Sequence, residues 1–358
     1  MAMHIFFEAN QYSIQEFVAL KSEQTFVMHA QSFLKNWISN LPFTFNSSGS
    51  TGTPKTLTFA KESLLESAFA TIQALNLSNN PQHILLCLSA QFVGGAMMLA
   101  RALALDCPIT ILEPSSNVFS KIGSEHPYTF ASFVPMQIMS EDFNLESFKK
   151  IEVVLIGGTS VSKALEVQLS AYPNRVYHTY GMSETLSHVA LKRFGLMQGY
   201  KAIQPYSINL NQDGCILITN TNSQQIISTH DIGEWVGEKE FIITGRTDFI
   251  INSGGLKINP EPIEKIVWEF FGSDLHEVFV LAKAKHTLLG EEAILVGTRS
   301  IDEKELFLLK EYLSARGFKK EAPKRYSRIN QIPLTLNGKL NRLKVNEWLD
   351  SQLFLGNL

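Results

Sequence analysis

Over roughly the first 200 residues, short apolar runs alternate with segments whose apolar residues recur at helical spacing. Short apolar runs are typical of buried strands, and helical spacing is typical of the helices that cover them. The runs predict strands at 5–7, 83–88, 108–112, 128–134, 151–156 and 175–180. The spacing predicts helices at 26–38, 61–75, 96–105 and 162–171. The alternation therefore predicts an α/β fold in which helices cover a mainly parallel sheet.

The pattern changes near residue 200. Shorter strands and turns follow, such as the turn at Asp213-Gly214. After Arg246 the chain reads as a smaller unit that mixes helices and strands. We therefore predict a large domain over residues 1–247, with helices on a mainly parallel sheet, and a small α+β domain over residues 248–358.

Within the small unit, one helix has predicted ends. Ser300 and Glu303 match the capping-box pattern ahead of a helical segment over residues 304–315. Gly317 follows this segment and is the residue type that most often closes a helix.

Composition narrows the class of protein. The chain is 45% hydrophobic and 18% charged, which is ordinary for a soluble globular enzyme. The net charge of −3 gives no electrostatic reason to expect nucleic acid or an anionic membrane as the main partner. The most apolar long stretch, 94–112, is interrupted by Arg101 and Asp106, so we do not expect it to span a membrane.

The cysteines indicate a reducing compartment. Cys87, Cys107 and Cys215 are far apart, lie in or beside apolar segments and form no C-x-x-C pair. The N-terminus lacks the basic start and long apolar run of a signal peptide. Both features suit reduced core thiols in a cytoplasmic protein.

A loop rich in hydroxyl side chains predicts a phosphate site. Residues 45–55 read F-N-S-S-G-S-T-G-T-P-K. The glycines let successive backbone N–H groups turn toward one point, the hydroxyls add donors, and Lys55 adds a positive charge. The loop of the P-loop NTPases has a similar lysine, but Pro54 offers no N–H before it, which disfavours that class. A flexible linker is the other reading, and the apolar flanks weigh against it.

A second motif, T-Y-G-M-S-E-T, ends the predicted strand at 175–180. The ring of Tyr180 can stack on a base, and Gly181 permits a turn. Ser183 can bond a phosphate, and Glu184 can hold a divalent cation against phosphate oxygens. Taken alone, a glutamate such as Glu184 is more often a surface carboxylate than a metal ligand.

A third motif places a carboxylate and a guanidinium on either side of a strand. Asp231 and Arg246 are spaced so that they can bracket the hydroxyls of a ribose. Gly254 and Gly255 mark a tight turn soon afterwards, before Lys257. A surface ion pair followed by an ordinary turn is the alternative for this motif in isolation.

A fourth motif, P-L-T-L-N-G-K-L-N-R, presents Lys339 after the turn Asn337-Gly338. Most lysines after such a turn are solvated.

The four motifs, in this order, resemble the signature set of the acyl-adenylate-forming superfamily, which includes acyl-CoA synthetases, luciferases and peptide-synthetase adenylation domains. The resemblance covers residues 45–342. It implies an enzyme that binds ATP, Mg²⁺, coenzyme A and a small carboxylic acid.

The resemblance also implies roles for single residues. The resemblance implies that the phosphates of ATP are bound by Ser47, Ser48, Gly49, Ser50, Thr51, Gly52 and Lys55. Adenine and ribose fall to Gly158, Thr159, Tyr180, Gly181, Asp231 and Arg246. Lys339, Glu184 and Ser183 are the expected catalytic residues, with Glu184 on the metal. Asp248 is the expected hinge of a mobile C-terminal domain, and Gly254, Gly255 and Lys257 lie on the coenzyme A side.

Two segments are similar to those of o-succinylbenzoate CoA ligases, which act in menaquinone biosynthesis. They are A-S-F-V-P-M-Q-I at 131–138 and Y-G-M-S-E-T-L-S-H at 180–188. Met136 replaces a usual threonine, and His188 replaces a usual glutamine. The family's histidine in P-L-F-H is missing here, with Gln91 or Phe92 nearest to its place.

The acyl pocket is the least defined part of the resemblance. Phe92 and His188 are its expected lining, and the second carboxylate of o-succinylbenzoate needs a donor or cation, for which Arg101, His188, Lys192 and Arg193 are candidates. Family members carry a much longer region before the phosphate loop than the 44 residues found here. Part of the pocket wall is therefore expected to be absent or to come from a partner subunit, as in a homodimer.

Three alternatives stay open at this point. The same machinery activates other aromatic or fatty acids in the superfamily. A carrier-protein-loading adenylation enzyme would transfer its acyl group to phosphopantetheine. A non-catalytic binding protein would require that Lys339 or Glu184 be inert.

Overall fold

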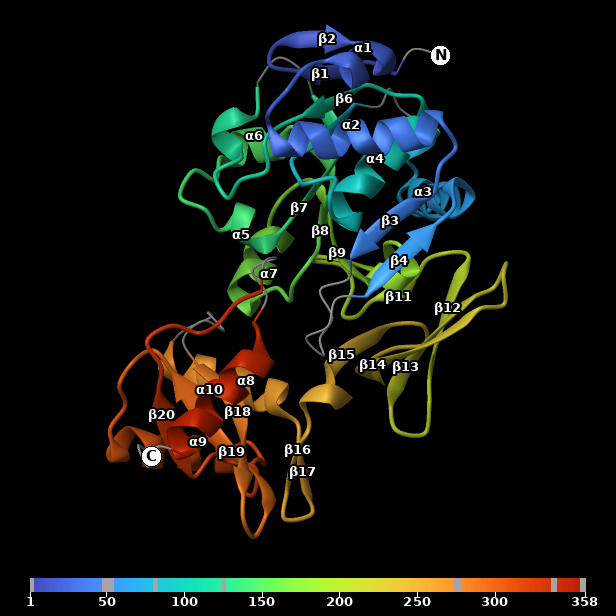
Figure 1. The fold of residues 1–358 in the computed structure, drawn as a ribbon. Helices are drawn as coiled ribbons and strands as arrows, with labels where there is room; N and C mark the ends of the chain where they lie inside the picture. The colour runs from blue at the N-terminus through green and yellow to red at the C-terminus, as the bar shows by residue number, and fades with distance from the viewer. Residues whose placement is uncertain are drawn as a thin grey trace.

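The computed structural model describes residues 3–46, 55–79, 83–123, 127–272, 279–335 and 340–354. Within these ranges a large mixed sheet carries helices on both faces, and smaller sheets follow it in the chain (Figure 1). The predicted α/β class is therefore confirmed, including the mainly parallel sheet.

The large sheet comprises nine strands of the described chain. From one edge to the other they are β11 (Lys201–Ala202), β10 (His188–Arg193), β9 (Arg175–Gly181), β8 (Ile151–Ile156), β7 (Tyr128–Phe133), β5 (Ile84–Leu86), β6 (Ile109–Ile111), β1 (Ile5–Phe7) and β2 (Asn10–Tyr12). The strands from β9 to β1 pair in parallel, whereas β10, β11 and β2 pair antiparallel at the edges. The predicted strands match these positions, and several are shorter than expected.

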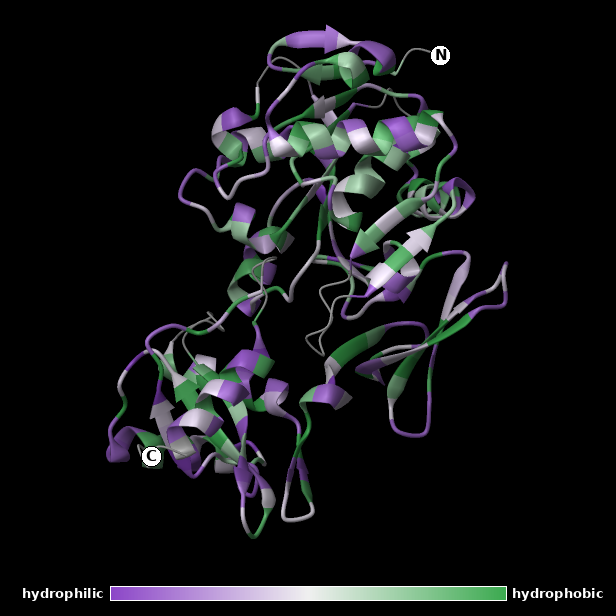
Figure 2. Ribbon diagram, viewed as in Figure 1, coloured by the Kyte–Doolittle hydropathy of each residue, from purple (hydrophilic) through white to green (hydrophobic). Residues whose placement is uncertain are grey.

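Each face of the sheet builds its own hydrophobic core. Phe130 and Leu155 belong to one cluster, and their chain neighbours Ala131 and Val154 belong to the other. Successive side chains of a strand point to opposite faces, so continuous apolar runs supply both cores. Figure 2 shows this concentration of hydrophobic residues on the central strands.

Helices cover the two faces unequally. The first face carries α2 (Thr25–Ile38), α3 (Lys61–Leu75) and α4 (Val93–Leu105). The second carries α5 (Pro135–Ile138), α6 (Leu145–Lys149) and α7 (Lys163–Ser170). A short helix, α1 (Ile14–Ala19), precedes α2, and single 3-10 turns are η1 (Leu77–Asn79), η2 (Phe119–Lys121), η3 (Ser183–Thr185) and η4 (Thr247–Phe249).

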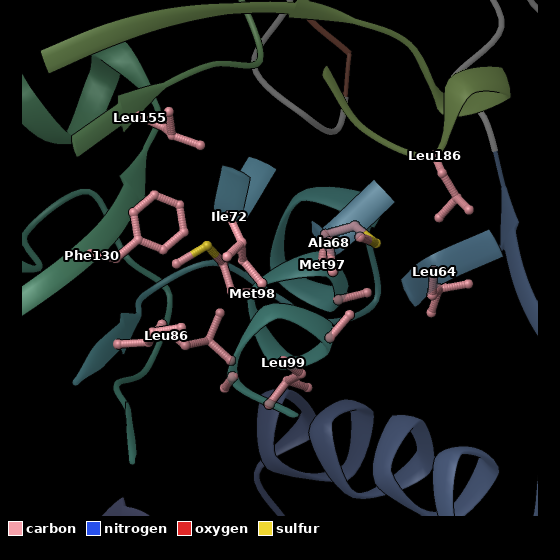
Figure 3. Packing of buried hydrophobic residues seen from close by; sticks show 14 of the residues in the cluster. Leu64, Ala68, Ile72, Leu86, Met97, Met98, Leu99, Phe130, Leu155 and Leu186 are labelled. Atoms are coloured by element: carbon pink, nitrogen blue, oxygen red, sulfur yellow. The ribbon is translucent and has the colours of Figure 1, made fainter. Parts of the chain in front are cut away.

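Helix α4 lies at the centre of the first core. Figure 3 shows Met97, Met98 and Leu99 among side chains of α3 and of the sheet. Met98 extends toward Phe130 of β7, and all of these side chains are fully buried. Helix α4 is buried along most of its length, so a charged residue on it cannot reach water.

The hairpin β3 (Phe43–Asn46) and β4 (Thr56–Phe59) brackets the predicted phosphate loop. The strands pair from Phe43 opposite Phe59 to Asn46 opposite Thr56, and the Thr56 hydroxyl donates to the Asn46 side chain at 3.1 Å. Residues 47–54 lie outside the described residues, but the two chain ends that carry them are held as a pair.

Two further sheets follow the large one. The first is antiparallel, in the order β12 (Tyr206–Leu210), β13 (Cys215–Asn220), β14 (Ile226–Trp235) and β15 (Phe241–Arg246). The second contains β17 (Leu256–Ile258), β16 (Ile251–Ser253), β19 (Gly290–Gly297), β18 (Phe279–His286) and β20 (Arg325–Arg328), with α8 (Pro260–Phe271), α9 (Glu303–Ala315) and α10 (Arg342–Phe354). Figure 1 shows this second group, in orange and red, after β15. The domain boundary at residue 248 falls between the two sheets and stays a prediction.

Helix α9 corrects the predicted cap. Its N-cap is Asp302, whose carboxylate accepts from the Glu305 N–H at 2.7 Å, and the Glu305 side chain accepts from the Asp302 N–H at 3.2 Å. The capping box is thus Asp302 with Glu305, and the prediction of Ser300 with Glu303 was wrong by two positions. Gly317 has φ +91°, so the predicted glycine closure is confirmed.

Candidate active site

The predicted adenine-side residues leave the sheet from two neighbouring strands. Strands β8 and β9 are parallel, with Ile156 opposite His178, so the segments that follow them emerge side by side. Gly158 has φ +92°, and a Cβ on Gly157 would lie 2.5 Å from the Thr179 hydroxyl. Carboxyl ends of parallel strands are where α/β sheets bind ligands.

His178 stabilises this edge, although it belongs to none of the four sequence motifs. Its Nε2–H donates to the Thr159 carbonyl at 3.1 Å, and the Tyr200 hydroxyl donates to its Nδ1 at 2.7 Å. Burial lowers the pKa of His178 to about 4, so the ring is neutral and keeps one donor and one acceptor. The neutral ring therefore holds the backbone of Thr159 in place.

Tyr180, Asp231 and Arg246 form one hydrogen-bonded group. The Tyr180 hydroxyl donates to Asp231 Oδ2 at 2.8 Å, and Arg246 Nη1 donates to Asp231 Oδ1 at 2.5 Å. Asp231 faces Arg246 across β14 and β15, which explains the spacing seen in the sequence. Burial and the Asp231 charge both raise the pKa of Tyr180, so its hydroxyl stays a donor. Three residues predicted to hold adenosine thus lie together.

The same arginine reaches the predicted hinge. Arg246 Nη2 donates to Asp248 Oδ2 at 2.9 Å, and His230 Nδ1 lies 2.8 Å from Asp248 Oδ1. Burial lowers the pKa of Arg246, but the charges of Asp231 and Asp248 outweigh this and raise it above its ordinary value. The ribose-side residues and the hinge position are therefore one electrostatic unit.

Phe249 lies between Arg246 and Arg342, the first residue of α10. The guanidinium of Arg246 lies 5.5 Å from the Phe249 ring centroid, and that of Arg342 lies 4.8 Å from it. Arg342 Nη1 and Nη2 donate to Glu264 at 2.8 and 2.5 Å, and Glu264 also accepts from the Leu281 N–H at 2.8 Å. Arg342 follows Lys339 by three residues, so the described end of that segment is anchored in the core.

Ser183 and Glu184 lie in the turn η3. Gly181 is required just before it, because a Cβ there would lie 2.3 Å from the Ser187 carbonyl oxygen. Glu184 is exposed, and no cation of the described chain pairs with it. Within the described ranges no three acidic, histidine or cysteine side chains gather into a metal site. A single exposed carboxylate nonetheless fits Mg²⁺ held mainly by phosphate oxygens.

Arg101 is the unexpected feature of α4. Its side chain is fully buried, and Nη2 donates to the Ser187 hydroxyl at 2.8 Å. No carboxylate pairs with it anywhere in the described residues, and its Nε–H has no partner there. Burial lowers its pKa to about 9, which still leaves it charged at neutral pH.

The other candidates for a carboxylate partner are engaged or neutral. Lys192 Nζ donates to Glu166 at 2.7 Å, and Arg193 lies 5.9 Å from the Tyr177 ring centroid. His188 is buried, and burial together with the Arg101 charge holds its pKa well below the ordinary value. Phe92 is 40% exposed at the start of α4. Arg101 is therefore the cation among the four candidates that a buried anion could use.

Some of the remaining predicted site residues lie outside the described residues, and the positions of the others are as follows. Ser47, Ser48, Gly49, Ser50, Thr51, Gly52 and Lys339 lie outside the described residues. Lys55 is exposed at the start of the β4 side of the hairpin. Gly254 and Gly255, with φ +58° and +87°, turn between β16 and β17, and Lys257 is exposed on β17. That hairpin contacts the β18–β19 turn, where the Gly254 N–H donates to the Leu289 carbonyl at 2.9 Å.

No helix in the described residues is both long and apolar enough to cross a membrane.

Comparison with known proteins gives a consistent family. Residues 20–215 match the family described as AMP-binding enzyme. A 2-succinylbenzoate–CoA ligase of Listeria monocytogenes is 27% identical over 349 residues, covering 89% of this chain and 72% of the relative. The corresponding ligase of Haemophilus influenzae is 27% identical over 334 residues, covering 84% and 69%.

Solved structures agree on the fold. An acyl-CoA synthetase (AMP-forming)/AMP-acid ligase II-like protein of Dyadobacter fermentans is 29% identical, with TM-score 0.59, over 95% of this chain and 99% of that one. An o-succinylbenzoate coenzyme A synthetase of Bacillus subtilis, in complex with ATP and magnesium ion, is 15% identical with TM-score 0.74, over 96% of both chains.

Proposed function

Because the chain belongs to the family of AMP-binding enzymes and, like the relatives described above, is an AMP-forming acyl-CoA synthetase, we propose that its acid substrate is o-succinylbenzoate. The product is the coenzyme A thioester, with AMP and pyrophosphate released, as a step toward menaquinone. The names of the two bacterial relatives support this choice of acid.

The observation that carries the proposal is the buried cation on α4. Removing a charge from water costs several kcal/mol unless a partner compensates it. The described partners of Arg101 are the Ser187 hydroxyl at 2.8 Å, the Met98 sulfur at 3.7 Å and the Phe130 ring, whose centroid lies 5.9 Å from Cζ; none of them carries a negative charge. o-Succinylbenzoate carries a ring carboxylate that is not activated, and a carboxylate is the natural partner of a guanidinium.

The nucleotide residues have distinct proposed roles. Tyr180, Gly158 and Thr159 bound the adenine site at the ends of β8 and β9, with Gly181 turning the chain after it. Asp231 accepts from the ribose hydroxyls, and Arg246 donates to that carboxylate and fixes its position. The loop over residues 47–52, with Lys55, binds the phosphates.

The metal has a limited role in this description. Bound Mg²⁺ supplies charge neutralisation on the phosphate oxygens of ATP. Glu184 is the carboxylate that would hold it, and the Ser183 hydroxyl can donate to a phosphate oxygen. The exposed position of Glu184 on η3 agrees with both roles.

Two half-reactions follow from this set. A carboxylate oxygen of the acid attacks the α-phosphorus, the bond to the pyrophosphate oxygen breaks, and acyl-AMP forms. The thiol of coenzyme A then attacks the acyl carbon, AMP leaves, and the thiol proton is lost to solvent. Lys339 offsets the charge that builds in the first step, and Gly254, Gly255 and Lys257 line the approach of coenzyme A in the second.

Replacing Lys339 tests whether this residue acts in adenylation but not in thioester formation. Lys339→Ala is expected to slow adenylation on the order of 100-fold to 1000-fold, the usual effect of removing a charge that stabilises a transition state. It should keep much of thioester formation from preformed acyl-AMP. An equal loss in both half-reactions of a folded variant would refute this role.

The substrate is tested by acid-dependent pyrophosphate release from MgATP, with and without coenzyme A. The acids are o-succinylbenzoate, benzoate, 4-coumarate, acetate and a long-chain fatty acid. Release with o-succinylbenzoate and formation of its thioester would support the proposal. Release only with another acid would refute the menaquinone role and leave the family chemistry intact.

Arg101→Met tests the carboxylate contact. We expect KM for o-succinylbenzoate to rise on the order of 100-fold, the usual effect of breaking a buried charge pair. 4-Oxo-4-phenylbutanoate lacks the ring carboxylate, and its KM should not change. Because the free protein loses an uncompensated buried charge, the free energy of unfolding should stay constant or increase. Arg193→Met is the control, and a variant that loses stability and handles both acids poorly would mark Arg101 as structural.

A further inference from the structure

Behind Arg101 lies a chain of buried polar side chains whose hydrogen bonds beyond Ser187 have no role in the mechanism above. It runs from Arg101 through Ser187, His188 and Thr71 to the Ser67 carbonyl, crossing from α4 to β10 and then to α3. Of these residues, Arg101, His188, Thr71 and Ser67 are fully or nearly fully buried. Buried polar chains of this kind are costly unless each member is satisfied.

We infer that His188 and Thr71 are positioning residues for the acid site, which hold the Ser187 hydroxyl as an acceptor for Arg101 and so fix the direction of its guanidinium. This inference rests on the proposed function, because it concerns the subsite for the second carboxylate. It assigns a purpose to the histidine that stands where similar ligases have glutamine.

The direction of each hydrogen bond follows from its ends. A guanidinium can only donate, so Arg101 Nη2 donates to Ser187 Oγ at 2.8 Å. The Ser187 hydroxyl proton is then directed to His188 Nδ1, at 3.3 Å. A neutral histidine with a bare Nδ1 carries its proton on Nε2, which donates to Thr71 Oγ1 at 3.1 Å. The Thr71 hydroxyl donates to the Ser67 carbonyl at 3.2 Å.

Charge excludes a doubly protonated His188. A proton on both nitrogens of His188 would place a second cation beside the buried guanidinium of Arg101. Burial and the Arg101 charge both lower the pKa of His188 and keep the ring neutral. Of the two neutral tautomers, the one with Nε2–H fits, because the single hydroxyl proton of Thr71 goes to the Ser67 carbonyl and cannot also go to Nε2.

The backbone at Ser187 is held separately, which isolates the role of its hydroxyl. The Thr185 hydroxyl donates to the Ser187 carbonyl at 2.7 Å, and Gly181 packs against that carbonyl. Substituting His188 or Thr71 thus changes where the Ser187 hydroxyl points without removing what holds its main chain. The effect on Arg101 should be one of orientation.

Thr71→Val and Thr71→Ser make a matched pair for the kinetic test. Valine keeps the shape and removes the hydroxyl, whereas serine keeps it. With Thr71→Val we expect KM for o-succinylbenzoate to rise about tenfold, the usual effect of one lost hydrogen bond in a charged network. The values of kcat, and KM for 4-oxo-4-phenylbutanoate, should stay near those of the wild type. Thr71→Ser should resemble the wild type for both acids.

His188→Gln and His188→Leu extend the same comparison. Glutamine can accept from Ser187 and donate to Thr71, so it should retain a low KM for o-succinylbenzoate, whereas leucine should not. Equal changes for both acids, or none in Thr71→Val and His188→Leu, would overturn the inference.

A spectroscopic measurement separates this inference from the proposed substrate. Long-range ¹H–¹⁵N spectra of the labelled protein without ligand should show His188 neutral at pH 7, with the proton on Nε2, and His188→Gln identifies the signal. Ser187→Ala should disturb the Nδ1 shift. If the wild-type enzyme does not turn over o-succinylbenzoate, the proposed substrate is wrong. The tautomer of His188 then tests the positioning role of His188 and Thr71 by itself. A protonated Nδ1 would overturn it.

Discussion

Two histidines are held neutral inside this protein, and both act by the hydrogen bonds of one tautomer. His178 joins the Tyr200 hydroxyl to the Thr159 carbonyl, and His188 joins Ser187 to Thr71. A neutral ring satisfies one donor and one acceptor, which a charged ring would not. At low pH this arrangement lowers the free energy of unfolding, because the two histidines bind protons more readily in the unfolded chain than in the folded protein.

Stability should therefore fall on acidification. An unfolded histidine binds its proton near pH 6.5, whereas folded His178 does so at about 4, so the unfolded state binds more protons between these values. From pH 7 to pH 5, His178 alone should lower the free energy of unfolding by about 2 kcal/mol. His188 adds to the fall in the same direction.

Urea unfolding at pH 7, 6 and 5 measures this slope. His178→Gln should be less sensitive to pH, since glutamine can still donate to Thr159. A wild-type slope that His178→Gln does not reduce would contradict the assignment.

Single residues differ in how far the sequence predicts them. Tyr180, Asp231 and Arg246 stand in motifs, and the structure joins them as one group. Arg101 is a charge in the most apolar segment, which is a visible signal, although not of what it contacts. Thr71 carries no signal, since its relation to His188 spans 117 positions of sequence. Tertiary contacts of that kind arise from packing and leave no local pattern.

Elements were predicted well where burial dictates their pattern. Helix α3 and strand β8 begin and end at the expected residues, because their apolar positions face one core or two. The ends of α9 were harder. Two serine, threonine or acidic residues near a helix start compete as caps, and the winner is set by where the chain enters the helix, as at Asp302.

The corrected cap makes a direct comparison possible. Asp302→Ala should lower the free energy of unfolding by about 1 kcal/mol, because it removes the acceptor for the Glu305 N–H. Ser300→Ala should change it little. Urea unfolding of the two variants, with the wild type alongside, measures the difference, and equal values would show that the Asp302 cap contributes nothing.

At the scale of the molecule, the predicted hinge position joins the predicted nucleotide residues to helix α10. Asp248 and Phe249 contact Arg246 on one side, and Phe249 contacts Arg342 on the other. The motifs predicted a small second unit, and its boundary at residue 248 stays a prediction. The amino-acid composition cannot show how the two units move relative to each other, because each has a core of ordinary apolar composition.

Asp248→Pro tests movement about this position. Proline fixes φ near −65° and restricts the residue before it, so rotation of the C-terminal unit should be hindered. We expect thioester formation from preformed acyl-AMP to slow by at least about tenfold relative to adenylation, if one turn of the hinge separates the two steps. Asp248→Ala serves as the control for the lost contact with Arg246. Equal effects on both half-reactions in the proline variant would argue against a hinge here.

The ion pair of Glu264 with Arg342 bears on how the chain is made. Glu264 is 1% exposed, and its partner follows 78 residues later at the start of α10. The ribosome synthesises Glu264 long before Arg342. A buried carboxylate without its partner destabilises the fold by about 3–5 kcal/mol. The C-terminal core is thus expected to close only when α10 emerges, after the segment that bears Lys339. During synthesis, the sheets that carry the proposed nucleotide residues would therefore be complete while the C-terminal core is still open.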